Sequence, residues 1–297
     1  MLTRWVLVVI ASLAMALVAA PALAQSKLKV VASFSILGDL VKNVGGDRVE
    51  VATLVGPNGD AHAYSPTPGD ARTLSEAKAV VVNGLGLEGW IGRLVEASGT
   101  KAPTIVAGRG INSRKMAEEG RQVIDPHAWQ SIANAKIYVA NIRDGLSQAD
   151  PAGQSVYAAN AQAYLARLDA LEQEVKAAID QIPADRRRII TTHNAFGYFG
   201  AAYGMDFIAP EGVSTDTEPS ASDVAKIIGQ IRQQKLPAVF LENISDPRLM
   251  QQIARETGAK IGGTLYSDAL SAANGPAGSY IDMMRHNLRE LTAALAR

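Results

Sequence analysis

Cysteine is absent from this chain of 297 residues, so disulfides cannot hold it together and we expect no lipid anchor on a cysteine. Aromatic residues make up only 5% of the chain, which disfavours a surface that stacks on nucleic-acid bases. Lys and Arg together number 29, as do Asp and Glu, so no excess of one charge favours nucleic acid or an anionic membrane. The sequence therefore gives no reason to expect a nucleic-acid partner.

The residues that are present are typical of a globular protein with one large or two ordinary domains. Hydrophobic residues make up 47% and charged residues 20%, without a low-complexity tract or a block of like charge. A domain of this size can bury a sizeable core, so it does not need disulfides for stability.

The longest apolar run lies at the N-terminus and has the pattern of a secretory signal peptide. Arg4 supplies a positive charge, residues 5–20 are apolar, and residues 21–24 end in the small-residue pattern that precedes cleavage. The run is too short and too rich in small residues to indicate a membrane span. We predict a signal peptide at residues 1–24, cleavage after Ala24 and a soluble periplasmic product without a lipid anchor. An uncleaved N-terminal anchor is the alternative.

Beyond this segment, strand-like and helix-like stretches alternate along the first half of the chain. Strands are predicted at residues 28–32, 49–55, 79–82 and 104–107, and helices at 36–44, 68–77, 87–97 and 131–148. Residues 108–126 are predicted to form an irregular polar loop.

One long helix is predicted at residues 151–182, where apolar residues recur at helical spacing and no Gly or Pro interrupts after Gln154. A helix of roughly 30 residues would span about 45 Å, too long for one layer of a small domain. Alternation then restarts, with strands at residues 188–192, 205–208, 238–242 and 260–266 and helices at 195–203, 222–234, 247–256 and 279–295. The predicted fold is α/β, with two lobes that are each a parallel sheet flanked by helices, joined by one long helix. The lobes are residues 25–150 and 184–297, and the linking helix is residues 151–183.

Residues 84–89 satisfy the G-x-G-x-x-G pattern, follow a predicted strand and precede a helix, as in dinucleotide-binding folds. However, the next strand ends in Gly108-Arg109 rather than in an acidic residue that could hold a ribose. We therefore interpret these glycines as a tight strand–helix turn. The sequence contains no phosphate-binding, serine-hydrolase or H-E-x-x-H zinc-protease motif.

Three of the four histidines follow predicted strands, where ligand sites form in open α/β sheets. His62 follows the second strand and His127 the fourth, while His193 follows the first strand of the second lobe and Asp268 follows the last. Each alone could be an ordinary loop or turn residue. Together, three imidazoles and a carboxylate suit a tetrahedral Zn(II) site between the lobes. Asp125 is interpreted as a turn residue or a support for His127, and His286 as an ordinary surface histidine.

Five motifs in this order resemble the substrate-binding proteins of zinc and manganese ABC transporters, over essentially the whole mature chain: residues 59–68 (GDAHAYSPTP), 83–88 (NGLGLE), 125–129 (DPHAW), 193–199 (HNAFGYF) and 266–270 (YSDAL). The resemblance implies two α/β lobes with a rigid linking helix and a metal in the cleft between them. By position it makes His62, His127, His193 and Asp268 the ligands. It further implies a monomer that is not an enzyme and that delivers its metal to an inner-membrane permease.

The identity of the metal depends on features that differ between subgroups of this family. Residues 108–123 contain no histidine, unlike the His-rich loop of many zinc-type members, and His193 stands where manganese-type members usually have Glu. Because three imidazoles favour Zn(II) over Mn(II), we predict zinc, with Mn(II) or Fe(II) as the alternative. Two further alternatives are a zinc-dependent hydrolase with Glu211 or Glu242 as its base and a binder of an organic solute. Any metal-linked change is expected in the loops around His127 and Asp268.

Overall fold

A computed structural model describes residues 26–118, 121–217 and 219–296 of the chain. The predicted signal peptide and its cleavage point after Ala24 lie outside these residues. Within the described ranges, no helix is both long enough and apolar enough to cross a membrane.

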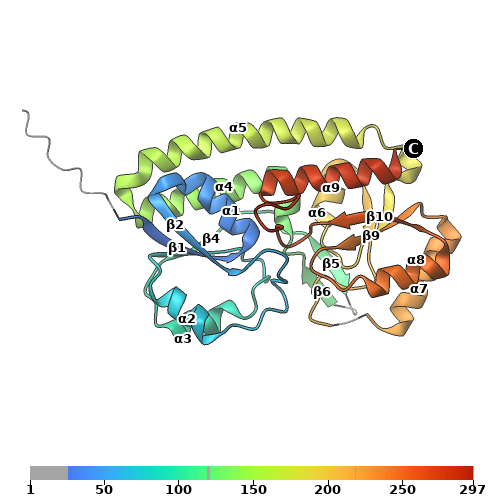
Figure 1. Ribbon diagram of the computed structural model, residues 1–297, viewed down its shortest axis with the longest axis horizontal. Coiled ribbons are helices and arrows are strands. Elements are labelled where there is room, and N and C mark those ends of the chain that lie inside the picture. The colour runs from blue at the N-terminus through green and yellow to red at the C-terminus, as the bar shows by residue number, and fades with distance from the viewer. Residues whose placement is uncertain (1–25, 119–120, 218, 297) are drawn as a thin grey trace, which may run out of the picture.

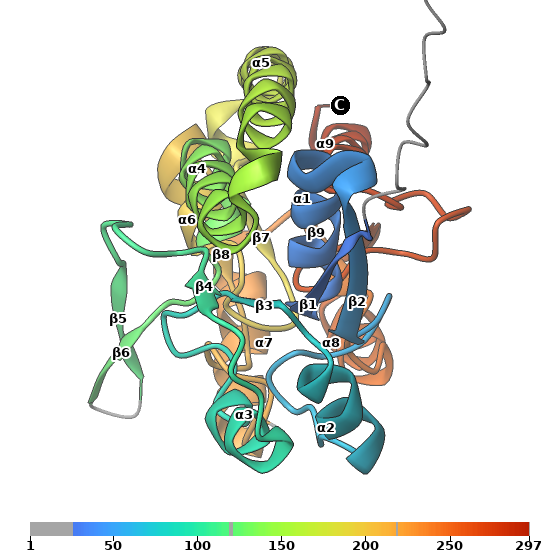
Figure 2. The same cartoon turned by 90° about the vertical axis from the view of Figure 1, so that its left-hand side faces the viewer.

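The first lobe is a four-stranded parallel sheet with the order β2-β1-β3-β4 (Figure 1). All four residues of β3 are buried because helices cover both faces of the sheet, as parallel sheets require. Figure 2 shows α1 and α4 on one face and α2 and α3 on the other. The strands are β1 (Leu28–Phe34), β2 (Val49–Val55), β3 (Ala79–Val82) and β4 (Thr104–Val106), and the helices are α1 (Ser35–Gly45), α2 (Pro68–Ser75), α3 (Ile91–Ser98) and α4 (Ile132–Ala149).

The second lobe repeats this plan with the parallel order β10-β9-β7-β8. Its inner helices α6 and α9 share one hydrophobic core with the first lobe, whereas α7 and α8 enclose a separate core on the far side of the sheet. The strands are β7 (Arg188–Ile190), β8 (Asp206–Ile208), β9 (Ala238–Glu242) and β10 (Lys260–Leu265), and the helices are α6 (Gly197–Tyr203), α7 (Ala221–Gln234), α8 (Arg248–Thr257) and α9 (Tyr280–Leu295).

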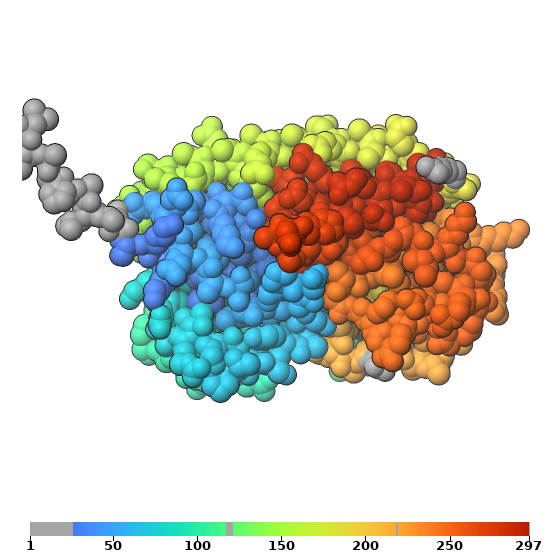
Figure 3. Space-filling view, viewed as in Figure 1, coloured from blue at the N-terminus to red at the C-terminus, as the bar shows by residue number. Residues whose placement is uncertain are grey.

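The long helix α5 (Gln154–Ile179) has 26 residues and spans about 39 Å. It follows a short 3-10 turn at Pro151–Gly153, where proline favours a helical start. Its buried face packs against α1 and α4 in the first lobe and against α9 in the second, so it runs along both lobes (Figures 1 and 3). The predicted fold class of two α/β lobes with one long helix is thus confirmed. The buried residues of this helix are Tyr157, Ala161, Tyr164, Leu168, Leu171, Val175 and Ile179.

The prediction that residues 108–126 form an irregular loop is wrong. The segment contains an antiparallel hairpin, β5 (Lys115–Glu118) and β6 (Arg121–Ile124), that stands out to one side of the first sheet (Figure 2). Strand β6 is mostly exposed, and Ile124 retains 44% of its surface. The described side chains of this hairpin belong to neither hydrophobic core, so its sequence need not show the alternation that marks a half-buried strand.

The glycine-rich residues 84–89 form the expected tight turn. Gly84, Leu85 and Gly86 lie in succession at φ of 77°, 57° and 89°, and helix α3 begins only at Ile91. The turn closes on the buried carboxylate of Glu88, whose Oε1 accepts hydrogen bonds from the Asn83 backbone N–H (2.6 Å) and the Ser33 hydroxyl (2.6 Å). The Glu88 Oε2 accepts from the Gly84 N–H at 3.3 Å. Backbone donors that would face a phosphate in a dinucleotide-binding turn are therefore occupied by the protein's own carboxylate.

We predict that Glu88→Ala will lower the free energy of unfolding by about 3 kcal/mol, because it leaves buried donors on Ser33, Asn83 and Gly84 without acceptors. Urea unfolding checks this, with Glu96→Ala on the exposed face of α3 as a control that changes stability by less than about 0.5 kcal/mol. Equal stability of the two variants would contradict the role assigned to Glu88.

Candidate metal centre

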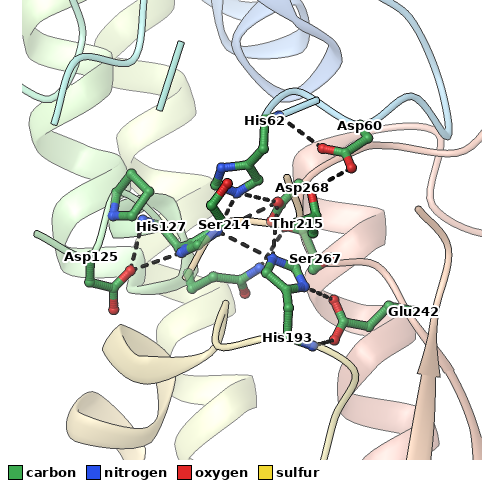
Figure 4. A network of polar contacts seen from close by, with 12 residues as sticks. Asp60, His62, Asp125, His127, His193, Ser214, Thr215, Glu242, Ser267 and Asp268 are labelled. Carbon is green, nitrogen blue, oxygen red and sulfur yellow. Dashed lines mark hydrogen bonds and ion pairs between the residues drawn. The ribbon is translucent and has the colours of Figure 1, made fainter. Parts of the chain in front are cut away.

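The structure brings together the four side chains that sequence reasoning singled out. His62, His127, His193 and Asp268 are all buried, and one donor atom from each lies within 4.8 Å of the others (Figure 4). His62 lies in the loop between β2 and α2, and His127 follows β6, while His193 and Asp268 each lie three residues past the ends of β7 and β10. The cluster forms because loops at the carboxyl ends of strands in both lobes meet.

Five of the six distances between the four donor atoms lie between 3.0 and 3.5 Å, and all four atoms lie within 4.8 Å of one another. The Nε2 atom of His127 lies 3.0 Å from Nε2 of His62 and 3.4 Å from Nε2 of His193. The Oδ2 atom of Asp268 lies 3.2 Å from Nε2 of His62, 3.5 Å from Nε2 of His127 and 3.2 Å from Nε2 of His193. Apart from the three imidazole nitrogens that face it, no hydrogen-bond donor among the described residues reaches either carboxylate oxygen of Asp268, although both oxygens are buried. A carboxylate left in this state is suited to hold a cation.

Two carboxylates behind the cluster orient two of the imidazoles. Asp125 Oδ1 accepts from the backbone N–H of His127 at 3.0 Å and lies 2.9 Å from its Nδ1. Glu242 Oε1 accepts from the backbone N–H of His193 at 2.9 Å, and Glu242 Oε2 lies 2.7 Å from Nδ1 of that ring in a close ionic contact. A proton held on Nδ1 by a carboxylate leaves the Nε2 lone pair directed at the centre.

The interpretation of Asp125 as a support for His127 agrees with these contacts. The role of Glu242 beside His193 was missed, because the sequence marked Glu242 only as a possible hydrolytic base. The signal that could have identified it is its place at the end of β9, which pairs with β7 directly before His193.

His286 lies outside the cluster and is not the ordinary surface residue predicted. It is partly buried on α9, and its Nε2 lies 2.9 Å from the carbonyl oxygen of Thr264. Its ring packs edge-on against Tyr266, at a centroid distance of 5.1 Å. It therefore helps to hold the end of β10.

Titration of the cluster is governed by burial and by the opposing carboxylates. Burial would lower the pKa of His127, but the carboxylates of Asp268 and Asp125 raise it to about 8. Burial opposes charge on His193 as well, yet Glu242 and Asp268 hold its pKa well above the usual range. Burial would raise the pKa of Asp268, but His127 and His193 hold it well below the usual range. Without a metal, His127 and His193 therefore retain protons at neutral pH.

Two α/β lobes on one long helix, with a buried cluster of three histidines and one carboxylate between them, define a metal-binding solute-binding protein. Residues 30–294 match the family described as "ZnuA: Zinc-uptake complex component A periplasmic", and the chain belongs to this family. The family consists of metal-binding components of ABC transporters, as the resemblance implied.

Individual relatives are similar over nearly their whole length. The "Manganese-binding lipoprotein MntA" of Halalkalibacterium halodurans is 35% identical over 270 residues, which cover 91% of this chain and 89% of that protein. The "Iron-binding protein YfeA" of Yersinia pestis is 34% identical over 265 residues, or 89% of this chain and 85% of that protein. The solved structure of the periplasmic zinc-binding protein TroA from Treponema pallidum has a TM-score of 0.87 and 32% identity, covering 92% of this chain and 100% of that one.

The names of these relatives bear on two expectations. They name three different metals, so the family alone does not select zinc. MntA is called a lipoprotein, which contradicts the expectation of a protein without a lipid anchor. A family that includes lipoproteins gives no reason to expect that its members lack an anchor.

We predict that metal affinity will rise with pH across the neutral range, because His127 and His193 both have raised pKa values. A histidine must lose its proton before it can bind a metal, and the raised pKa of His127, about 8, means that binding displaces a proton at neutral pH. Each displaced proton weakens binding about tenfold per pH unit below that pKa. Competition titrations with a chelator of known affinity between about pH 6 and 8 measure the slope. An affinity independent of pH over this range would contradict the prediction.

Replacement of Glu242 by Gln is predicted to weaken metal binding about 10- to 100-fold, because an amide cannot hold the Nδ1 proton of His193 as a carboxylate does. The matched control is Glu174→Gln, which removes an exposed ion pair with Arg285 on the helices α5 and α9. Chelator competition should show wild-type affinity for the control. Equal affinities for the two variants would show that Glu242 does not support the site.

Proposed function

We propose that this protein captures Zn(II) between its lobes and delivers it to an ABC-type permease for uptake. The observation that carries the proposal is the compact set of four donor atoms, in which five of the six distances run from 3.0 to 3.5 Å and all are within 4.8 Å. Four ligands at the usual zinc bond lengths lie about 3.3 Å apart at the corners of a tetrahedron. In this reading His62, His127, His193 and Asp268 are the four ligands.

The kind of donor atom supports zinc as much as the spacing does. Three imidazole nitrogens and one carboxylate form a softer set than the oxygen-rich, six-coordinate sites that Mn(II) prefers. Mn(II) or Fe(II) remains the second candidate, because the relatives MntA and YfeA are named for manganese and iron. The second oxygen of Asp268 is buried without a donor and could raise the coordination number for such an ion.

A binding protein rather than an enzyme is the function that this arrangement favours. Four protein donors fill a tetrahedral shell and leave no position for the water that a zinc hydrolase activates. Glu242, one of the two candidate bases, contacts the far nitrogen of His193 instead of facing the centre. Turnover of a substrate that is lost when the metal is removed would contradict this part of the proposal.

The proposal also includes the oligomeric state, the location and the lobe boundaries expected from the sequence. We propose that the protein works as a monomer in the periplasm after removal of residues 1–24. Residues 25–150 and 184–297 form its metal-binding lobes and residues 151–183 link them. The long helix α5 packs on both lobes, so metal-linked change is proposed to be confined to loops at the site.

The direct test is metal content after expression, followed by competition between Zn(II) and Mn(II) for the metal-free protein. We expect one Zn(II) per chain and preference for Zn(II). His127→Ala should weaken zinc binding at least about 100-fold. His286→Gln, which keeps a donor to Thr264, should bind as the wild type does. Preference for Mn(II) would overturn the metal assignment, and metal binding unaffected by His127→Ala would overturn the site.

We further predict that His193→Glu combined with Glu242→Gln will lower the preference for Zn(II) over Mn(II) at least about tenfold, because the site then holds two carboxylate ligands. The second substitution removes the negative charge that would otherwise oppose the new glutamate, since Glu242 lies 2.7 Å from His193 Nδ1. Competition titrations of the double variant and of Glu242→Gln alone measure the change in preference. An unchanged preference would count against His193 as a ligand.

A further inference from the structure

Three of the four proposed ligands are locked into place by buried hydrogen bonds that cross between the lobes. The carbonyl oxygen of Ser267, next to Asp268, accepts from Trp129 Nε1 at 2.9 Å and from Gln130 Nε2 at 2.7 Å, just after His127. The Tyr280 hydroxyl donates to the carbonyl oxygen of Trp129 at 2.6 Å. These contacts join the segments around His127 and Asp268 through groups that are not themselves proposed ligands.

His193 is fixed to the same framework. Its backbone is held by Glu242, and the hydroxyl of Tyr198 on the following helix α6 donates to the carbonyl oxygen of Asp125 at 3.1 Å. His127, His193 and Asp268 are all fully buried. They therefore form a three-ligand pocket whose members cannot separate without breaking buried contacts.

His62 differs from the other three ligands in exposure and in support. It retains 9% of its surface, and it is the one ligand of the four that lines a cleft of about 630 Å³ that also includes Tyr64, Trp90, Val123 and Ser214. Among the described residues, no carboxylate contacts its outer ring nitrogen, in contrast to His127 and His193. An ion that enters or leaves through this cleft passes His62 first.

The backbone of His62 is held by one carboxylate that reaches across to the other lobe. Asp60 Oδ1 accepts from the backbone N–H of His62 at 2.8 Å and from that of Ala63 at 3.4 Å. The other oxygen of Asp60 accepts a hydrogen bond from the Thr215 hydroxyl at 2.5 Å (Figure 4). Thr215 lies in the loop between β8 and α7 of the second lobe, whereas Asp60 belongs to the first.

We propose that Asp60 and Thr215 form a latch across the lobes that holds His62 over the three-ligand pocket and thereby sets the rate of metal release. Asp60 and Thr215 are positioning residues, since they act on the metal only through His62. The inference rests on the proposed function, because it takes the four side chains as metal ligands. Beyond that function, it names Asp60 and Thr215 as the residues that control metal release. It also places this control at the cleft beside His62 rather than at the long helix α5.

The test measures how fast bound Zn(II) leaves the full chain when an excess of chelator is added in a stopped-flow experiment. Thr215→Val keeps the shape of the side chain but removes its hydroxyl, so it should speed dissociation about tenfold. Thr215→Ser restores the hydroxyl and should restore the wild-type rate. Thr292→Val, which removes a hydroxyl that bonds only within α9, is the matched control and should release zinc at the wild-type rate.

A double-variant cycle tests whether Thr215 acts through Asp60. In an Asp60→Ala background the latch is already broken, so Thr215→Val should cause no further acceleration. Wild-type dissociation from Thr215→Val, failure of Thr215→Ser to restore the rate, or an undiminished effect of Thr215→Val in the Asp60→Ala background would each overturn the latch. A wild-type protein that binds no stoichiometric zinc would instead overturn the proposed function, so the two failures are distinguishable.

Discussion

The rest of the structure depends on one constraint, which is that the negative charge of several buried carboxylates between the lobes must be compensated. Asp268, Asp125 and Glu242 are each at most 3% exposed and cluster around three imidazoles. Within the described ranges no lysine or arginine pairs with Asp268 or Glu242, so the compensating charge must come from protons or from a cation. Burying carboxylates without such compensation is strongly unfavourable. The raised pKa of His127 and His193 and the proposed affinity of the centre for a divalent ion have this same electrostatic origin.

The fold supplies the rigidity that this constraint requires. The two parallel sheets direct the loops at their carboxyl ends toward one another. Helix α5 packs on both lobes and so fixes the positions of these loops relative to one another. The shared core through α6 and α9 and the buried bonds from Ser267 and Tyr280 make the lobe contact part of the interior rather than an open hinge. A site preformed in this way binds its ion without first ordering its ligands, which lowers the cost of binding.

Features read from local patterns could be predicted from the sequence, whereas features that depend on partners far apart along the chain could not. Strands such as Val49–Val55 are short apolar or alternating runs, and α5 repeats its buried residues at helical spacing. The four proposed ligands were singled out because each follows a predicted strand, and the structure brings them together. The Glu242–His193 contact spans 49 residues and the Asp60–Thr215 contact 155, and neither leaves a mark in the local sequence.

The hairpin β5–β6 escaped prediction for a different reason. Its strands lie outside both cores, so nothing required alternation of apolar and polar residues between Lys115 and Ile124. Composition there resembles a loop, because the hairpin is held by its own ladder and by its connection to Asp125. The backbone N–H of Asp125 donates to the carbonyl oxygen of Arg114 at 3.0 Å, which closes the base of the hairpin next to His127.

The proposed selectivity for Zn(II) depends on the pair His193 and Glu242 rather than on His193 alone. Glu242 supports position 193 with both oxygens: Oε1 accepts from the backbone N–H groups of Thr192 and His193, and Oε2 contacts the Nδ1 atom of His193. A glutamate at position 193 would bring a second buried carboxylate against the first, and like charges in contact at low dielectric are unfavourable. An imidazole satisfies Glu242 on one nitrogen and the metal on the other, so the supporting carboxylate itself favours the nitrogen donor. The proposed preference for a nitrogen-rich site, and through it for zinc, therefore depends on the end of β9 as well as on the proposed ligands.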